Sequence, residues 1–128
     1  MDTLDARIAE SFGRQKLLAT LGARLTRVGD GEVEIELPFS ESIQQQHGFA
    51  HAGAIATIAD SACGYACLTK MSEGSAVLSV EFKINLLAPA VGERLSRGRS
   101  RRGSGRRLEL RRRRCLRLIV ERRKRLLR

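Results

Sequence analysis

The chain has 128 residues and an apolar content of 42%, which suggest one globular domain with its own hydrophobic core. Three cysteines, an odd number without framework spacing, argue against a disulfide scaffold and favour a reducing, cytoplasmic setting. The formal net charge is +10, but residues 1–94 carry 8 Lys and Arg against 12 Asp and Glu, so the basic charge lies after them.

The N-terminal segment is expected to be a helix rather than a secretory signal. The stretch MDTLDARIAESFG is acidic where a signal would be basic, and it has no apolar core. Residues 3–21 are predicted to form one helix that ends at Gly22. Its apolar stripe consists of Leu4, Ile8, Leu17, Leu18 and Leu21.

A β-hairpin is predicted next, with strands over residues 23–28 and 32–37 and a turn at 29–31. Strict alternation in the second strand puts one apolar face in the core and three glutamates in water, and Pro38 ends the strand. The buried face carries Val33, Ile35 and Leu37. Residues 40–50 are predicted to be a loop or short helical turn.

The central apolar stretch, Ala52 to Thr69, has 18 residues and one charge, Asp60. It just reaches the length of a membrane span, but an aspartate at the centre of a bilayer would be costly. We therefore expect a helix over residues 52–68 that is covered by protein on most sides, with no membrane association. Cys63 and Cys67 within it are interpreted as small core residues.

The second half of the chain reads mainly as strands. Residues 76–87 are predicted to form one twelve-residue strand, with the even-numbered residues from Ala76 to Leu86 on one face. Pro89 ends this strand, and another begins at Val91. Together with the preceding elements, this order predicts an α+β fold, an antiparallel sheet with a helix wrapped in it.

Residues 95–128 carry 16 Lys and Arg against 2 Asp and Glu, a net charge of +14. Three interpretations compete: a nucleic-acid-binding arm, a source of cations for a phosphorylated ligand, or an altered C-terminus such as one from a shifted reading frame. The abrupt change near Leu95 and the monotony of arginine favour the third. A turn at residues 103–105 and alternating apolar residues after it also allow two or three strands there.

Asp60 is the main candidate for chemistry. An unpaired buried carboxylate costs several kcal/mol, and the alternative is that Asp60 faces solvent or caps a neighbouring element. A carboxylate in a dry site can act as general base or nucleophile, and the unpaired N–H groups at Ala52 and Gly53 can hold the oxyanion. The helix start and Asp60 are separated by about 12 Å of helical rise, so a carboxylate from a partner subunit would serve the site better.

Two histidines precede the central helix. His47 and His51 are interpreted as residues that fix the loop. No metal site is expected, because the His-Glu-x-x-His pattern is absent and no further ligands appear at suitable spacing.

The stretch QQHGFAHAGAIATIAD resembles the hotdog-fold acyl-CoA thioesterases of the PaaI-like group. That family has Asn or Gln, then a glycine three residues later, then His-Gly-Gly, and then an acidic residue on the central helix. Here Gln45, Gly48, His51 and Asp60 stand at these places, although Ala52 replaces the first glycine of the His-Gly-Gly triplet. The strand SVEFKINLLAPA is also similar to the family's next strand, and the resemblance covers about residues 12–94.

The resemblance implies a single hotdog domain over residues 1–128, a curved antiparallel sheet around a long helix, with an atypical Arg-rich segment at 95–128. It implies that Asp60 attacks the thioester carbonyl as base or nucleophile and that Ala52 and Gly53 form the oxyanion hole. Gln45 would orient the carbonyl or the water. The implied substrate-binding residues are His51, which holds the loop, Gly48 and Ser79.

The implied activity is hydrolysis of acyl- or aryl-CoA to a free acid and CoA, with no cofactor beyond the CoA of the substrate. The implied assembly is a homodimer or a dimer of dimers with its sites between subunits. Two other functions compete: a non-catalytic acyl-CoA binder, and nucleic-acid binding through the basic segment, which lacks aromatic residues for base stacking. The sequence does not name the acyl group.

Overall fold

The structure is a computed structural model that describes residues 3–86, 89–90, 94–96, 106–110 and 116–121, with side chains for 6–86 and 89–90. The N-terminal segment forms two helices, α1 (Thr3–Gly13) and α2 (Lys16–Leu21), where the sequence predicts one. The break lies at Gln15, whose backbone is extended and whose side chain donates a 2.8 Å hydrogen bond to the Tyr65 hydroxyl. The stop at Gly22 is confirmed, with a φ of 71°.

The apolar stripe of this segment is only partly confirmed. Ile8 and Leu18 are fully buried, but Leu17 is 57% exposed. The break between the two helices changes the rotation of α2 relative to the predicted continuous helix, and this turns Leu17 outward. The side chain of Leu4 lies outside the described residues.

The predicted hairpin is confirmed. Strand β1 (Arg24–Gly29) pairs antiparallel with β2 (Glu32–Pro38), and the paired residues Gly29 and Glu32 close the turn. One face of β2 is buried as predicted, through Val33, Ile35 and Leu37. The three glutamates of β2 are half-buried rather than fully in water, because strands flank β2 on both sides.

A loop with a short 3-10 helix, η1 (Glu41–Ile43), leads to the central helix α3 (Ala52–Leu68), whose bounds match the prediction. Nine residues of α3 are buried, including Ile55, Ile58 and Tyr65. One side of the helix is only half-buried, in contrast to the nearly complete cover that the sequence suggests. This side carries Ala56, Thr57, Asp60, Ser61, Gly64 and Cys67.

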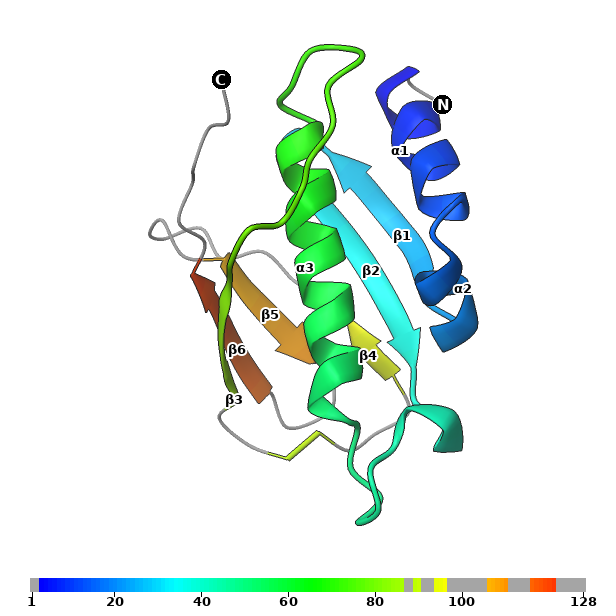
Figure 1. The fold of residues 1–128 in the computed structure, drawn as a ribbon, viewed down its shortest axis with the longest axis vertical. Helices are drawn as coiled ribbons and strands as arrows, with labels where there is room; N and C mark the ends of the chain where they lie inside the picture. The colour runs from blue at the N-terminus through cyan, green and yellow to red at the C-terminus, as the bar shows by residue number, and fades with distance from the viewer. Residues whose placement is uncertain (1–2, 87–88, 91–93, 97–105, 111–115, 122–128) are drawn as a thin grey trace.

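The remaining strands are β3 (Lys83–Leu86), β4 (Arg94–Ser96), β5 (Arg106–Leu110) and β6 (Leu116–Glu121). With β1 and β2, these strands form two antiparallel three-stranded sheets, in the orders β1-β2-β4 and β3-β6-β5. Strand β4 of the first sheet contacts β5 of the second, so the second sheet extends the first. Figure 1 shows α3 lying across this sheet, with α1 and α2 beside β1. The predicted α+β architecture is confirmed.

The predicted twelve-residue strand is wrong in its length and in its faces. Only Lys83–Leu86 pairs with a strand of the described chain, and Leu87 lies outside the described residues. Residues 76–82 run beside α3, and none of the described strands pairs with them; Leu78 is 79% exposed while Val77 packs on the core. Since Ile84 also packs on the core, odd residues face α3 in the first part and even residues in the second.

Part of the Arg-rich segment joins the sheet, because β5 and β6 lie within it and pair with each other and with β3. The strands predicted from the alternating apolar residues after the turn at 103–105 are therefore confirmed. The interpretation of this segment as an altered C-terminus stays a prediction. The predicted turn at residues 103–105 and Cys115 lie outside the described residues.

The core lies between α3 and the sheet and contains side chains from α1, β2 and α3, with Cys63 buried as predicted. Helix α1 is tied to the end of α3 by Arg7, which donates hydrogen bonds to the carbonyl oxygens of Leu68 at 2.7 Å and Ser72 at 3.3 Å. None of the helices in the described ranges is long and apolar enough to cross a membrane.

Candidate active site

The start of α3 is shaped by His51, the N-cap residue. Its backbone is extended, and its Nδ1 accepts a 2.8 Å hydrogen bond from the Gly53 N–H. A side chain at position 53 would bring Cβ to 3.0 Å from that Nδ1, which explains why glycine stands there. The Gly53 N–H is therefore engaged by the cap. The Ala52 N–H, by contrast, finds no acceptor among the described residues.

The loop before α3 is held mainly by its own backbone. Gly48 has a φ of 79°, which favours glycine, and its N–H donates a 3.0 Å hydrogen bond to the Gln45 carbonyl oxygen. The Ala50 N–H donates to the Ala90 carbonyl oxygen at 2.9 Å, and this bond ties the loop to the segment after β3. The loop thus reaches α3 in one fixed path.

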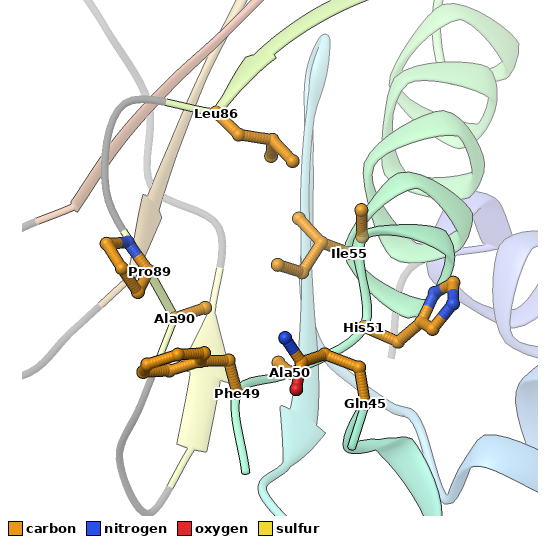
Figure 2. Close-up of a pocket in the computed structure, with 9 residues that line it drawn as sticks. Gln45, Phe49, Ala50, His51, Ile55, Leu86, Pro89 and Ala90 are labelled. Atoms are coloured by element: carbon orange, nitrogen blue, oxygen red, sulfur yellow. The ribbon is translucent and has the colours of Figure 1, made fainter. Parts of the chain in front are cut away.

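The side-chain amide nitrogen of Gln45 has no acceptor among the residues that the structure describes. The Oε1 of Gln45 accepts a hydrogen bond from the His47 N–H, so the amide nitrogen Nε2 is left on the other side. Figure 2 shows this nitrogen turned toward the space below Leu86 and beside Ile55. In the same view the His51 ring points away from that space, which agrees with its capping role.

That space is a cavity of about 570 Å³ between the start of α3, the loop and the end of β3. The size falls within the range of small-molecule sites, roughly 300–1,000 Å³. Apolar side chains form most of its wall. The cavity is lined by Gln45, Phe49, Ala50, His51, Ala52, Ile55, Leu86, Pro89 and Ala90.

Asp60 lies two turns further along α3, on the half-buried side of the helix, and it does not line the cavity. Its Oδ1 accepts a 2.5 Å hydrogen bond from the Ser79 hydroxyl, on the extended segment beside α3. One carboxylate oxygen is thereby fixed, and Oδ2 is available to a proton or a water molecule.

The predicted site residues therefore fall into two groups within one chain. Gln45, His51 and Ala52 line the cavity, whereas Gly48 and Gly53 do not. Ser79 joins Asp60 instead of the cavity. Ala52 and Asp60 lie eight residues apart on α3, which corresponds to about 12 Å of helical rise. No cluster of three or more His, Cys, Asp or Glu in the described part of the chain could hold a metal ion.

Sequence reasoning missed the apolar wall of the cavity. Pro89 is recognised only as the end of a strand, and Ala90 is given no role, although both line the cavity. The contact of Ala90 with the loop joins residues forty positions apart, and no local pattern reports it. Only the alternation predicted for residues 76–87, which places Leu86 on one apolar face, could have indicated a role for Leu86.

Comparison with known proteins gives two kinds of match. The sequence model of the thioesterase superfamily matches residues 47–96, which contain the last residues of the loop, α3, β3 and β4. It ends where the Arg-rich segment begins. No curated protein matches the chain.

Among solved structures, a thioesterase family protein from Silicibacter pomeroyi is 37% identical, with a TM-score of 0.79 over 91% of this chain and 93% of that one. The Escherichia coli PaaI protein from the phenylacetic acid degradation operon is 17% identical, with a TM-score of 0.71 over 91% and 89% of the two chains. A thioesterase from Haemophilus influenzae is 17% identical, with a TM-score of 0.68 over 94% and 91%. The last two show a shared fold, and the first covers enough of the chain to include part of the Arg-rich segment.

Proposed function

The chain belongs to the thioesterase superfamily, with the hotdog fold expected from its sequence, and we propose that it hydrolyses acyl- or aryl-CoA to a free acid and CoA. The observation that carries this proposal is the pair of unused donors at one end of an apolar cavity. These donors are the Ala52 N–H at the start of α3 and the Nε2 of Gln45. Both suit an oxygen that becomes negative during the reaction.

The reaction follows from these groups. The thioester carbonyl oxygen accepts hydrogen bonds from Ala52 and Gln45, and Oδ2 of Asp60 takes a proton from water as hydroxide adds to the carbonyl carbon. The tetrahedral intermediate carries its negative charge on the oxygen beside the two donors. When the C–S bond breaks, the protonated Asp60 returns its proton to the CoA thiolate, and the acid is released.

The geometry favours a site shared by two subunits. Asp60 is too far from Ala52 of its own chain to act on a carbonyl held there, but an antiparallel partner would bring its own Asp60 to this helix start. Among the described residues, segment 76–82 has no strand partner beside the half-buried side of α3, and Leu78, Val80 and Phe82 on it are exposed. We therefore assign this segment to a homodimer interface.

The direct test is release of free thiol from a panel of acyl- and aryl-CoA thioesters. Wild-type protein is expected to turn over, and Asp60→Asn, which keeps the side-chain size and the acceptor for Ser79, is expected to lower kcat by about 10²- to 10⁴-fold. A circular dichroism spectrum identical to that of the wild type would show that the variant is folded. Full activity of Asp60→Asn would remove Asp60 from the mechanism, and no release from any thioester would overturn the proposed activity.

A further inference from the structure

The cavity has a polar end and an apolar end. At the polar end lie the two donors proposed for the carbonyl oxygen, from Gln45 and Ala52. Leu86 lies on the side of the cavity away from Gln45, with Ile55 between the two, and Pro89 lies next to Ala90, as Figure 2 shows. If the carbonyl lies at the donors, the acyl chain beyond it extends along this apolar wall.

The described residues that line the cavity include no counter-ion for a charged group on the acyl chain. None of their side chains is Asp, Glu, Lys or Arg. His51 is the one titratable member, but its ring points away and its Nδ1 is occupied by the Gly53 N–H. A carboxylate or an ammonium at the end of the acyl chain would lose its water against Ile55 and Leu86 without a counter-ion, which costs several kcal/mol when burial is complete.

We propose, on the basis of the proposed function, that the site selects uncharged, apolar acyl groups and that Leu86 is the residue that determines this selectivity. Ile55 is 3% exposed and belongs to the core, so its change would disturb the fold. Leu86 is 49% exposed and lies on β3, where the strand ladder holds its backbone to Leu118. The chemistry at position 86 can therefore change while the surrounding structure stays.

The test compares two six-carbon thioesters that differ only in a terminal carboxylate, hexanoyl-CoA and adipoyl-CoA. Their dissociation constants are measured by calorimetry on full-length Asp60→Asn, which retains Leu86 and the cavity and removes turnover from the measurement. We expect hexanoyl-CoA to bind at least about ten-fold more tightly, a ratio that corresponds to about 1.4 kcal/mol. Equal dissociation constants, or no binding of either compound, would overturn the inference.

A second set of variants assigns the selectivity to position 86. In the Asp60→Asn background, Leu86→Arg supplies a cation and is expected to reduce the preference for hexanoyl-CoA by about five-fold. Leu17→Arg adds the same charge at an exposed leucine on α2, outside the cavity lining, and is expected to leave the preference unchanged. An equal effect of both variants, or no effect of Leu86→Arg, would overturn the role of Leu86.

The two proposals fail in different ways. Hydrolysis of hexanoyl- and adipoyl-CoA by wild-type protein at equal kcat/KM would leave the thioesterase activity standing and overturn the selectivity. Selective binding of hexanoyl-CoA without hydrolysis of any thioester would overturn the activity and support the selectivity.

Discussion

Ser79 donates a 2.5 Å hydrogen bond from its hydroxyl to Oδ1 of Asp60, and this bond joins the extended segment 76–82 to the half-buried side of α3. In the proposed mechanism it fixes the carboxylate so that Oδ2 faces the attacking water. Ser79→Ala is expected to lower kcat by about 10- to 100-fold, because a hydrogen bond to a charged group contributes about 1.5–3 kcal/mol. KM should change little, since Ser79 does not line the cavity.

Ser79→Thr is the matched variant, because it keeps the hydroxyl and adds one methyl group at an exposed position. Steady-state thiol release should show most of the wild-type kcat for the threonine variant. A rise in KM with unchanged kcat in Ser79→Ala would instead place Ser79 at the substrate, as the family resemblance implies.

The shared site predicts complementation between two inactive variants. Gln45→Ala lacks one oxyanion donor and should lose about 10²- to 10³-fold in kcat, and Asp60→Asn lacks the base. If the two are mixed in equal amounts and allowed to exchange subunits, half of the dimers are mixed and each has one intact site. Activity should recover to about a quarter of the wild-type value, as expected for a symmetric dimer.

Activity of the mixture is followed over time and compared with each variant alone at the same total concentration. Native mass spectrometry of the mixture, with one variant isotopically labelled, shows when half of the dimers are mixed and exchange is complete. If mixing restores nothing after exchange is complete, both groups act within one chain, and the assignment of Asp60 to the neighbouring subunit is wrong.

The fold was predictable where a local pattern coincides with burial. Alternation in β2 gives the buried face because one side of that strand lies on α3, and the apolar run gives the bounds of α3. The break at Gln15 depends on Tyr65, fifty residues away, so no local pattern contains it. Alternation in residues 76–82 indicates two faces but identifies no partner, and it therefore predicts a paired strand where the described residues form none.

The candidate site was predictable only in its polar residues. Gln45, His51 and Asp60 are recognised because their types and spacing resemble a family motif. The sequence does not reveal that the Gly53 N–H is already taken by the His51 ring, because this depends on a side-chain rotamer. The assignment of an oxyanion donor to Gly53 is thus less favourable than the one to Ala52.

The contribution of the His51 cap at the start of α3 to the free energy of unfolding can be measured. His51→Ala removes the acceptor of the Gly53 N–H and is expected to lower the free energy of unfolding by about 1 kcal/mol. His51→Asn restores a good capping side chain and should recover most of this loss. Urea unfolding followed by circular dichroism measures both variants. Equal stability of wild type and His51→Ala would show that the cap contributes nothing.

Thr69 ties the hairpin turn to the end of α3. Its buried hydroxyl accepts a 2.8 Å hydrogen bond from the Gly31 N–H and donates one of 2.9 Å to the Ala66 carbonyl oxygen. Thr69→Val leaves that N–H without an acceptor and should lower the free energy of unfolding by about 1–3 kcal/mol. The control is Thr20→Val on α2, where an exposed threonine also donates to a carbonyl and a change within about 0.5 kcal/mol is expected. Equal losses in urea unfolding would contradict the role of burial.

The proposed dimer depends on the unpaired segment 76–82. Val80 on this segment is 65% exposed, so Val80→Lys leaves the core of one chain intact and places a charge where the partner strand would pair. Light scattering after size exclusion should show a monomer with a normal circular dichroism spectrum. Its thioesterase activity should be lost, because Asp60 then has no second helix start to act on. The exposed Leu17→Lys on α2 serves as control and should stay dimeric and active. A monomeric Val80→Lys with full activity would show that one chain carries the whole site.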